Sequence, residues 1–158
     1  MKTPIENRDL TKQPPHSPHD RFGGFAIIGR TVDKCKASIS GKLGEYHFDC
    51  PLDNMLFGFK GITGEQFKTA VTASKNYEDV AEWVNKNGTA KSPEEIEAWS
   101  EKVEQLKLKD VPSMKAPDKQ KEARQNCEKL GLDFDNATLF AWLDADDEAS
   151  FHSAMAAK

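Results

Sequence analysis

The sequence lacks any long run of apolar residues. A helix that crosses a bilayer needs about 20 consecutive, mostly apolar residues, and no segment of the 158 residues approaches that length. The first residues, from Met1 to Asp9, also lack the apolar stretch of a secretory signal. We therefore expect a cytoplasmic protein that has no membrane partner.

Cysteine is scarce, and its spacing is uninformative. The three cysteines, Cys35, Cys50 and Cys127, are odd in number and widely separated, with no Cys-x-x-Cys pair. Small secreted scaffolds and zinc sites need regular cysteine frameworks or close cysteine and histidine sets. The pattern argues against both classes, so we expect reduced thiols and no cofactor.

A metal site is not expected from the histidines either. His16, His19 and Asp20 fall within a few residues of one another. A metal site needs ligands that converge from a rigid scaffold, however, and these residues belong to a proline-rich segment. We predict no bound metal.

Signature motifs of common enzyme classes are missing as well. The sequence contains no phosphate-binding loop, no Gly-x-Ser-x-Gly and no dinucleotide-binding fingerprint. The net charge is -4 and the isoelectric point is near 5.6, so the concentrated basic face required by a nucleic-acid partner is not expected. Whether the protein is an enzyme stays open.

Alternation of polar and apolar residues at the period of a half-buried strand is also absent. Apolar residues recur at helical spacing instead, as in Ile28, Val32, Cys35 and Ile39. We therefore predict an all-α fold, an irregular bundle of about six to seven short helices.

Proline, glycine and capping residues predict where the helices begin and end. Prolines and two glycines crowd residues 1–24, and each proline pushes the residue before it toward extended geometry, so this segment is predicted to be an arm. The first helix is predicted at about 25–40 and should end at Gly41. Later helices are predicted to begin at Pro51, after Thr63 and Asn76, at Pro93 and at Asp118, with a linker at 108–117 and a short last helix around 139–143.

This chain length suits one domain. We predict the proline-rich arm at 1–24, packed on or near a single helical domain at 25–147, and a frayed tail at 148–158.

Reactive side chains crowd the segment from Gly41 to Asp53, which we call the turn segment. Cys50 stands directly before Pro51, hence at the start of a helix, where the dipole and unpaired N–H groups favour a thiolate. His47 lies three residues earlier and is a candidate base. One hypothesis is therefore an activated thiol; the alternative is an inert cysteine that anchors a turn.

Charged residues on the first helix suggest a second hypothesis. Arg30 and Lys34 are spaced to project together, opposite the apolar stripe. If this face meets the turn segment, Glu45 and Asp53 are able to pair with them and form a polar pocket. The alternative is a solvated helix face with weak surface pairs. The candidate pocket residues are Arg30, Asp33, Lys34, Glu45, Tyr46, Cys50 and Asp53.

The same residues carry a family resemblance. The shared motifs are Asp9-Leu10-Thr11-Lys12-Gln13-Pro14-Pro15, Ser17-Pro18, Gly23-Gly24, Arg30, Val32-Asp33-Lys34, Gly44-Glu45-Tyr46 and Cys50-Pro51-Leu52-Asp53. The chain resembles the bacterial family catalogued as domain of unknown function 5069, over most of its length and most strongly over residues 9–61. The resemblance implies a protein without an assigned activity, and it places motif residues on the candidate pocket.

We therefore expect a small binding or interaction domain whose partner is a small molecule or a protein. Two alternatives stay open: a thiol-based enzyme or redox sensor that uses Cys50, and a purely structural motif in which a buried, salt-bridged turn holds the arm and first helix together.

Overall fold

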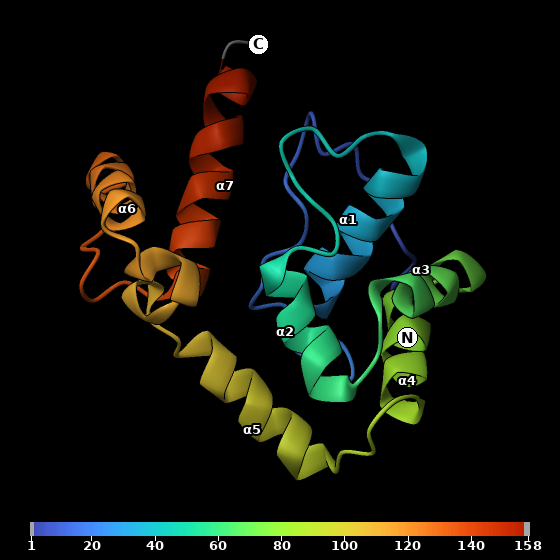
Figure 1. Cartoon of the computed structure of the whole chain (residues 1–158). Coiled ribbons are helices and arrows are strands. Elements are labelled where there is room, and N and C mark those ends of the chain that lie inside the picture. Colours follow the sequence, from blue (N-terminus) through green and yellow to red (C-terminus); the bar gives the residue numbers. More distant parts are fainter. Residues whose placement is uncertain (1, 157–158) are drawn as a thin grey trace. The chain divides into compact units, whose positions relative to one another are not determined.

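The computed structural model describes residues 2–156, with side chains through Phe151. Within these residues the chain forms seven α-helices and two short 3₁₀ helices and no strand, so the prediction of an all-α fold is confirmed (Figure 1). Backbone contacts divide the chain into two compact units, Met1–Ser100 and Glu101–Lys158. The boundaries predicted from sequence, an arm at 1–24 and one domain at 25–147, stay a prediction.

The first unit is organised around α1. Its helices are α1 (Ile28–Ser40), α2 (Pro51–Lys60), α3 (Gly64–Ala73) and α4 (Tyr77–Lys86), and α5 (Pro93–Glu104) begins in it. Helix α1 lies against α2, α3 and α4 (Figure 1). Aromatic rings fill the space between α2 and α3, where the ring centroids of Phe57 and Phe67 are 5.2 Å apart. Burial of these side chains is the main favourable term in the stability of this unit.

Helix starts follow the local signals. At α3, Gln66 donates its backbone N–H to the Thr63 hydroxyl, and its side chain accepts the Thr63 N–H, which completes a capping box. At α5, Ser92 and Glu95 exchange the same pair of bonds. Both starts were predicted from sequence.

Helix α1 begins at Ile28, three residues later than predicted. The backbone of Ile27 is left-handed, with φ of 74°, and its N–H donates to the carbonyl of Pro18. The N–H of Ala26 donates to the buried hydroxyl of Ser100, on α5. Because these distant partners hold the preceding residues, the helix cannot extend toward Phe25. Ile39, the last residue of the apolar pattern that predicts this helix, is 48% exposed, whereas Ile28, Val32 and Cys35 are buried.

The proline-rich arm is tied to the helices along its length. Near its start, the N–H and hydroxyl of Thr3 donate to the Glu78 carboxylate, and the N–H of Ile5 donates to the carbonyl of Lys75. Further along, Leu10 is fully buried. The arm therefore forms part of the first unit.

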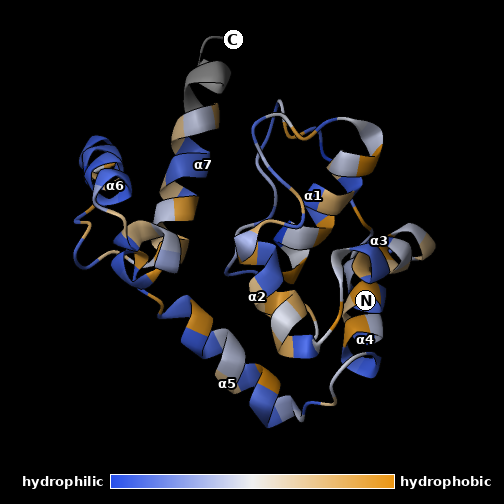
Figure 2. Cartoon of the chain, in the orientation of Figure 1, coloured by the Kyte–Doolittle hydropathy of each residue, from blue (hydrophilic) through white to orange (hydrophobic). Residues whose placement is uncertain are grey.

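The second unit contains two further α-helices. They are α6 (Pro117–Lys129) and α7 (Leu139–Ala156), preceded by the 3₁₀ helices η1 (Leu108–Asp110) and η2 (Pro112–Lys115) in the predicted linker. Most of α6 is hydrophilic (Figure 2), and Ala123 and Cys127 are its buried residues. The Trp142 indole of α7 donates to the Asn126 side chain of α6 over 2.7 Å.

Helix α7 is longer than the short helix predicted at 139–143. Its sequence contains no proline or glycine, and alanine favours a helix. The tail predicted at 148–158 thus begins inside a helix; residues 157–158 lie outside the described part of the chain. No helix among the described residues combines the length and apolarity that a membrane crossing requires.

Candidate functional site

The charged face of α1 is buried. Arg30 and Lys34 are each 3% exposed, and Asp33 is completely buried. These residues therefore do not form the solvated face that was one alternative. Groups from the arm, the turn segment and α4 surround two carboxylates, Asp33 and Asp53.

Asp33 joins the arm to two helices. One carboxylate oxygen accepts the backbone N–H of His16 at 2.8 Å, and the same oxygen lies 2.6 Å from the Nδ1 atom of the His16 ring. The other oxygen accepts the Tyr77 hydroxyl of α4 over 2.5 Å. The guanidinium of Arg8 lies farther away, at 3.9 Å. Both oxygens thus have partners, as a buried carboxylate requires.

Asp53 joins the turn segment to α1. Its Oδ1 accepts the Thr31 hydroxyl and pairs with the Lys34 ammonium, each at 2.9 Å. Its Oδ2 accepts the backbone N–H of Asp49 at 3.0 Å, and Asp49 has a left-handed backbone. The carboxylate therefore fixes both a helix and a strained turn. We call His16, Thr31, Asp33, Lys34, Asp53 and Tyr77 the ionic junction.

Cys50 lies at the edge of this junction. It precedes the first residue of α2 and is half-buried, and the Lys34 ammonium is 3.3 Å from its sulfur. The predicted partner His47 is exposed, and the structure shows no hydrogen bond between His47 and Cys50 within residues 2–151. The cation beside the thiol is therefore a lysine from α1.

The remaining candidate residues are Arg30, Tyr46 and Glu45. The Arg30 guanidinium carbon is 5.5 Å from the centroid of the Tyr46 ring, within the range of a cation–π contact, and one guanidinium nitrogen is 3.4 Å from the His16 carbonyl. Tyr46 is half-buried and Glu45 is exposed. By exposure, the predicted residues thus divide into four that are buried, two that are half-buried and one that is exposed: Arg30, Asp33, Lys34 and Asp53; Tyr46 and Cys50; and Glu45.

Sequence reasoning missed several members of the junction. The sequence suggests a role for His16 only as a metal ligand, and it gives no indication of Tyr77 or Thr31. The one available signal is that His16 lies in the proline-rich arm, which the sequence predicts to pack on or near the helical domain. Within the part of the chain that the structure describes, no three histidine, cysteine, aspartate or glutamate side chains converge as a metal site would require.

Burial changes the pKa values of three groups in the first unit, Tyr77, Cys35 and Lys60. It raises the pKa of Tyr77, and the hydrogen bond to Asp33 raises it further because a phenolate cannot donate. Burial also raises the pKa of Cys35 to about 12, so this thiol stays protonated. Burial lowers the pKa of Lys60, whose amine donates to the carbonyls of Asn85 and Thr89.

A depression occurs in the second unit, on the surface of α6. None of its residues belongs to the turn segment. They are Pro117, Gln120, Lys121, Arg124, Gln125 and Glu128.

The fold and the ionic junction define an all-helical protein in which a proline-rich arm and a polar turn are fixed to a buried helix. A family model matches residues 12–149, and the chain belongs to that family, which is described as Domain of unknown function (DUF5069). The match includes every candidate residue and confirms the family resemblance. No curated protein matches the chain.

Proposed function

We propose that the chain is a small binding or interaction domain and that the outer side of the turn segment is its recognition surface. The observation that carries this proposal is the burial of the ion-paired Asp53 carboxylate, which accepts the backbone N–H of Asp49 in a turn with exposed polar side chains. The proposal includes a bacterial origin and a cytoplasmic location, both expected from sequence.

The physical argument starts from the cost of burying charge. Desolvation of a buried ion pair offsets much of its attraction, and well-packed apolar residues of similar volume often give equal or greater stability. A buried pair does, however, favour one arrangement of its partners. Here the Asp53 carboxylate of the pair also accepts the backbone N–H of Asp49, whose backbone is left-handed, so the pair and this part of the turn segment are held together.

A turn held in this way suits recognition. Glu45 and His47 are exposed, and Tyr46 and Cys50 are half-buried, so a carboxylate, an imidazole and a phenol meet solvent together. Loops on rigid supports are common recognition sites, and preorganisation reduces the entropy lost on binding. A small polar molecule or a polar protein surface fits this chemistry.

A thermal-shift screen of polar metabolites tests the proposal. We expect a ligand that raises the melting temperature of the wild-type protein and of Glu94→Ala, an exposed control on α5, but not of Glu45→Ala or Tyr46→Ala. Arg30→Ala is a poorer probe because Arg30 is buried. Ligands that bind all four proteins equally, or no ligand at all, would contradict a recognition surface here.

A second candidate function is a thiol-based enzyme or redox sensor that uses Cys50. The Lys34 ammonium at 3.3 Å and the start of α2 favour it, since nearby cations and helix N-termini accompany reactive thiols. Iodoacetamide labelling tests whether Cys50 is a reactive thiol. The labelling rate is measured as a function of pH, and Cys50→Ser serves as the blank. A rate profile like that of free cysteine would rule it out.

A further inference from the structure

Lys34 and Cys50 form a close amine and thiol pair from two different elements. Lys34 lies on α1, Cys50 lies at the start of α2, and their Nζ and Sγ atoms are 3.3 Å apart. The Lys34 side chain is only 4% exposed, and its ion pair with Asp53 holds the amine in place. The amine is thus fixed at the sulfur by the fold.

Cys50 differs from the two other cysteines in access. Cys35 and Cys127 are buried, and burial raises the pKa of both thiols. Cys50 is half-buried. A small oxidant in solvent therefore reaches Cys50 most readily, and thiol oxidation follows exposure and thiolate character.

We propose that Lys34 and Cys50 are the site of a reversible, peroxide-induced covalent crosslink. In the first step the Cys50 sulfur attacks one oxygen of hydrogen peroxide. The O–O bond breaks, an S–O bond forms, and water leaves, so the thiol is oxidised by two electrons to a sulfenic acid and the peroxide is reduced.

In the second step the Lys34 amine attacks the sulfenic sulfur. Asp53 Oδ1, 2.9 Å from Nζ, takes the proton that the ammonium must lose before its lone pair is free. An S–N bond forms, the S–O bond breaks, and the departing hydroxide leaves as water with a second amine proton. This condensation has the chemistry of the sulfenamides that cysteine sulfenic acids form with nitrogen.

The crosslink changes the junction that supports the turn segment. It converts the Lys34 ammonium into the uncharged nitrogen of a sulfenamide, so Asp53 loses its ion pair. The new S–N bond also links α1 covalently to the start of α2. Two equivalents of a thiol reverse it, because they become a disulfide while the original amine and thiol return. The proposal does not depend on the proposed binding function.

Peptide mapping of the wild-type protein is the primary test. The full chain is treated with hydrogen peroxide and digested with a protease that cleaves at acidic residues, and peptides are measured before and after dithiothreitol. We expect one linked pair of peptides, carrying Lys34 and Cys50, with a mass about 2 Da below their sum, and its loss after reduction. Fragmentation locates the bond and separates it from a disulfide.

Two variants supply the matched comparison. Lys36→Arg, two residues along the same helix, should form the crosslink as the wild-type protein does. Lys34→Arg keeps a cation beside the sulfur but offers no amine, so sulfenic acid at Cys50 should accumulate and be trapped by dimedone. The proposal is overturned if the wild-type protein gives a dimedone adduct, a sulfinic acid or unmodified thiol at Cys50 and no linked peptide; this outcome needs no variant to fold.

Discussion

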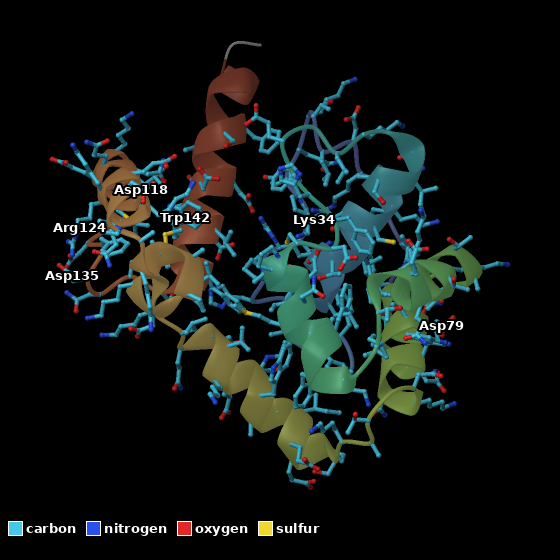
Figure 3. All side chains as sticks on the ribbon, in the orientation of Figure 1. Lys34, Asp79, Asp118, Arg124, Asp135 and Trp142 are labelled. Atoms are coloured by element: carbon cyan, nitrogen blue, oxygen red, sulfur yellow. The ribbon has the colours of Figure 1, made fainter. Side chains whose placement is uncertain are left out.

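Two ion pairs of this chain have the same length and opposite surroundings. Lys34 and Asp53 in the first unit are 2.9 Å apart, with side chains 4% and 0% exposed. Arg124 and Asp135 in the second unit are also 2.9 Å apart, with side chains 50% and 53% exposed. Figure 3 labels Lys34, and it shows Arg124 and Asp135 close together beside α6. Distance alone therefore says little about what an ion pair contributes.

The helices α1 and α6, which carry one residue of each pair, also differ in burial. Both α1 and α6 contain 13 residues and several charges. The arm and neighbouring helices bury most of α1, whereas α6 has two buried residues. The charged residues of α1 thus hold parts of the fold together, while those of α6 mostly meet water. What covers a helix decides the role of its charges.

The largest expected effect is that of Asp53→Ala. The substitution leaves the Lys34 ammonium buried without its carboxylate, and it removes an acceptor from Thr31 and Asp49. Breaking a buried pair in this way costs about 3 to 5 kcal/mol of unfolding free energy. Urea unfolding of the full chain, followed by circular dichroism, measures the loss.

The double variant Lys34→Met/Asp53→Leu provides the control for this result. It replaces both charges by apolar groups, so it should recover much of the stability that Asp53→Ala loses. If Asp53→Ala lowers the unfolding free energy by less than about 1 kcal/mol, the buried pair contributes no more than a surface pair does. That result would contradict the contrast between the two ion pairs.

The parts of the fold that sequence predicts are those with local causes. The start of α3 depends on Thr63 and Gln66, which lie within one helical turn, and the pattern reveals both. The start of α1 depends on Ser100, which is 74 residues from Ala26. No local pattern in one sequence contains that contact.

The candidate site shows the same division. Helical spacing groups Lys34 with Arg30, and the sequence predicts a pair with Asp53 only if this face of the first helix meets the turn segment, as it does in the structure. The sequence did not indicate that His16 and Tyr77 complete the cluster, since the arm and α4 reach Asp33 only in the folded chain. Burial of a charged face is a tertiary property.

A smaller effect is expected for Tyr77→Phe, which sharpens the comparison within the first unit. It removes one hydrogen bond to Asp33 and keeps the aromatic ring, which stacks on Phe22 with centroids 4.8 Å apart. A buried acceptor that loses its donor costs about 1 to 3 kcal/mol. Urea unfolding at neutral pH measures it, and a stability equal to that of wild-type protein would show that Asp33 does not need the phenol.

The next prediction concerns how the stability depends on pH, and it involves the buried thiol of Cys35 on α1. Burial raises the pKa of the Cys35 thiol from 9.0 to about 12, so between these values the unfolded chain loses a proton that the folded chain retains. Its contribution to stability is complete below about pH 9 and falls as pH rises toward about 12. Tyr77, whose pKa is also raised, acts in the same direction.

Urea midpoints measured from about pH 8 to about pH 11 test this prediction. We expect the midpoint of the wild-type protein to fall across this range, and to fall less steeply for Cys35→Ala. Cys50→Ala, at the half-buried thiol, is the control. Parallel slopes for wild-type protein and Cys35→Ala would show that the buried thiol does not contribute to the alkaline loss.

The smallest effect is expected at the exposed pair, from Asp135→Ala. Water solvates the Arg124 guanidinium as soon as its partner is removed, and salt screens the attraction even in the intact pair. The guanidinium also keeps its position 4.6 Å from the centroid of the Phe134 ring. We expect the urea midpoint to stay within experimental error of wild-type protein at both low and high salt. A clear loss at low salt that high salt abolishes would mean that this surface pair stabilises the second unit, and exposure would then not be what separates it from Lys34 and Asp53.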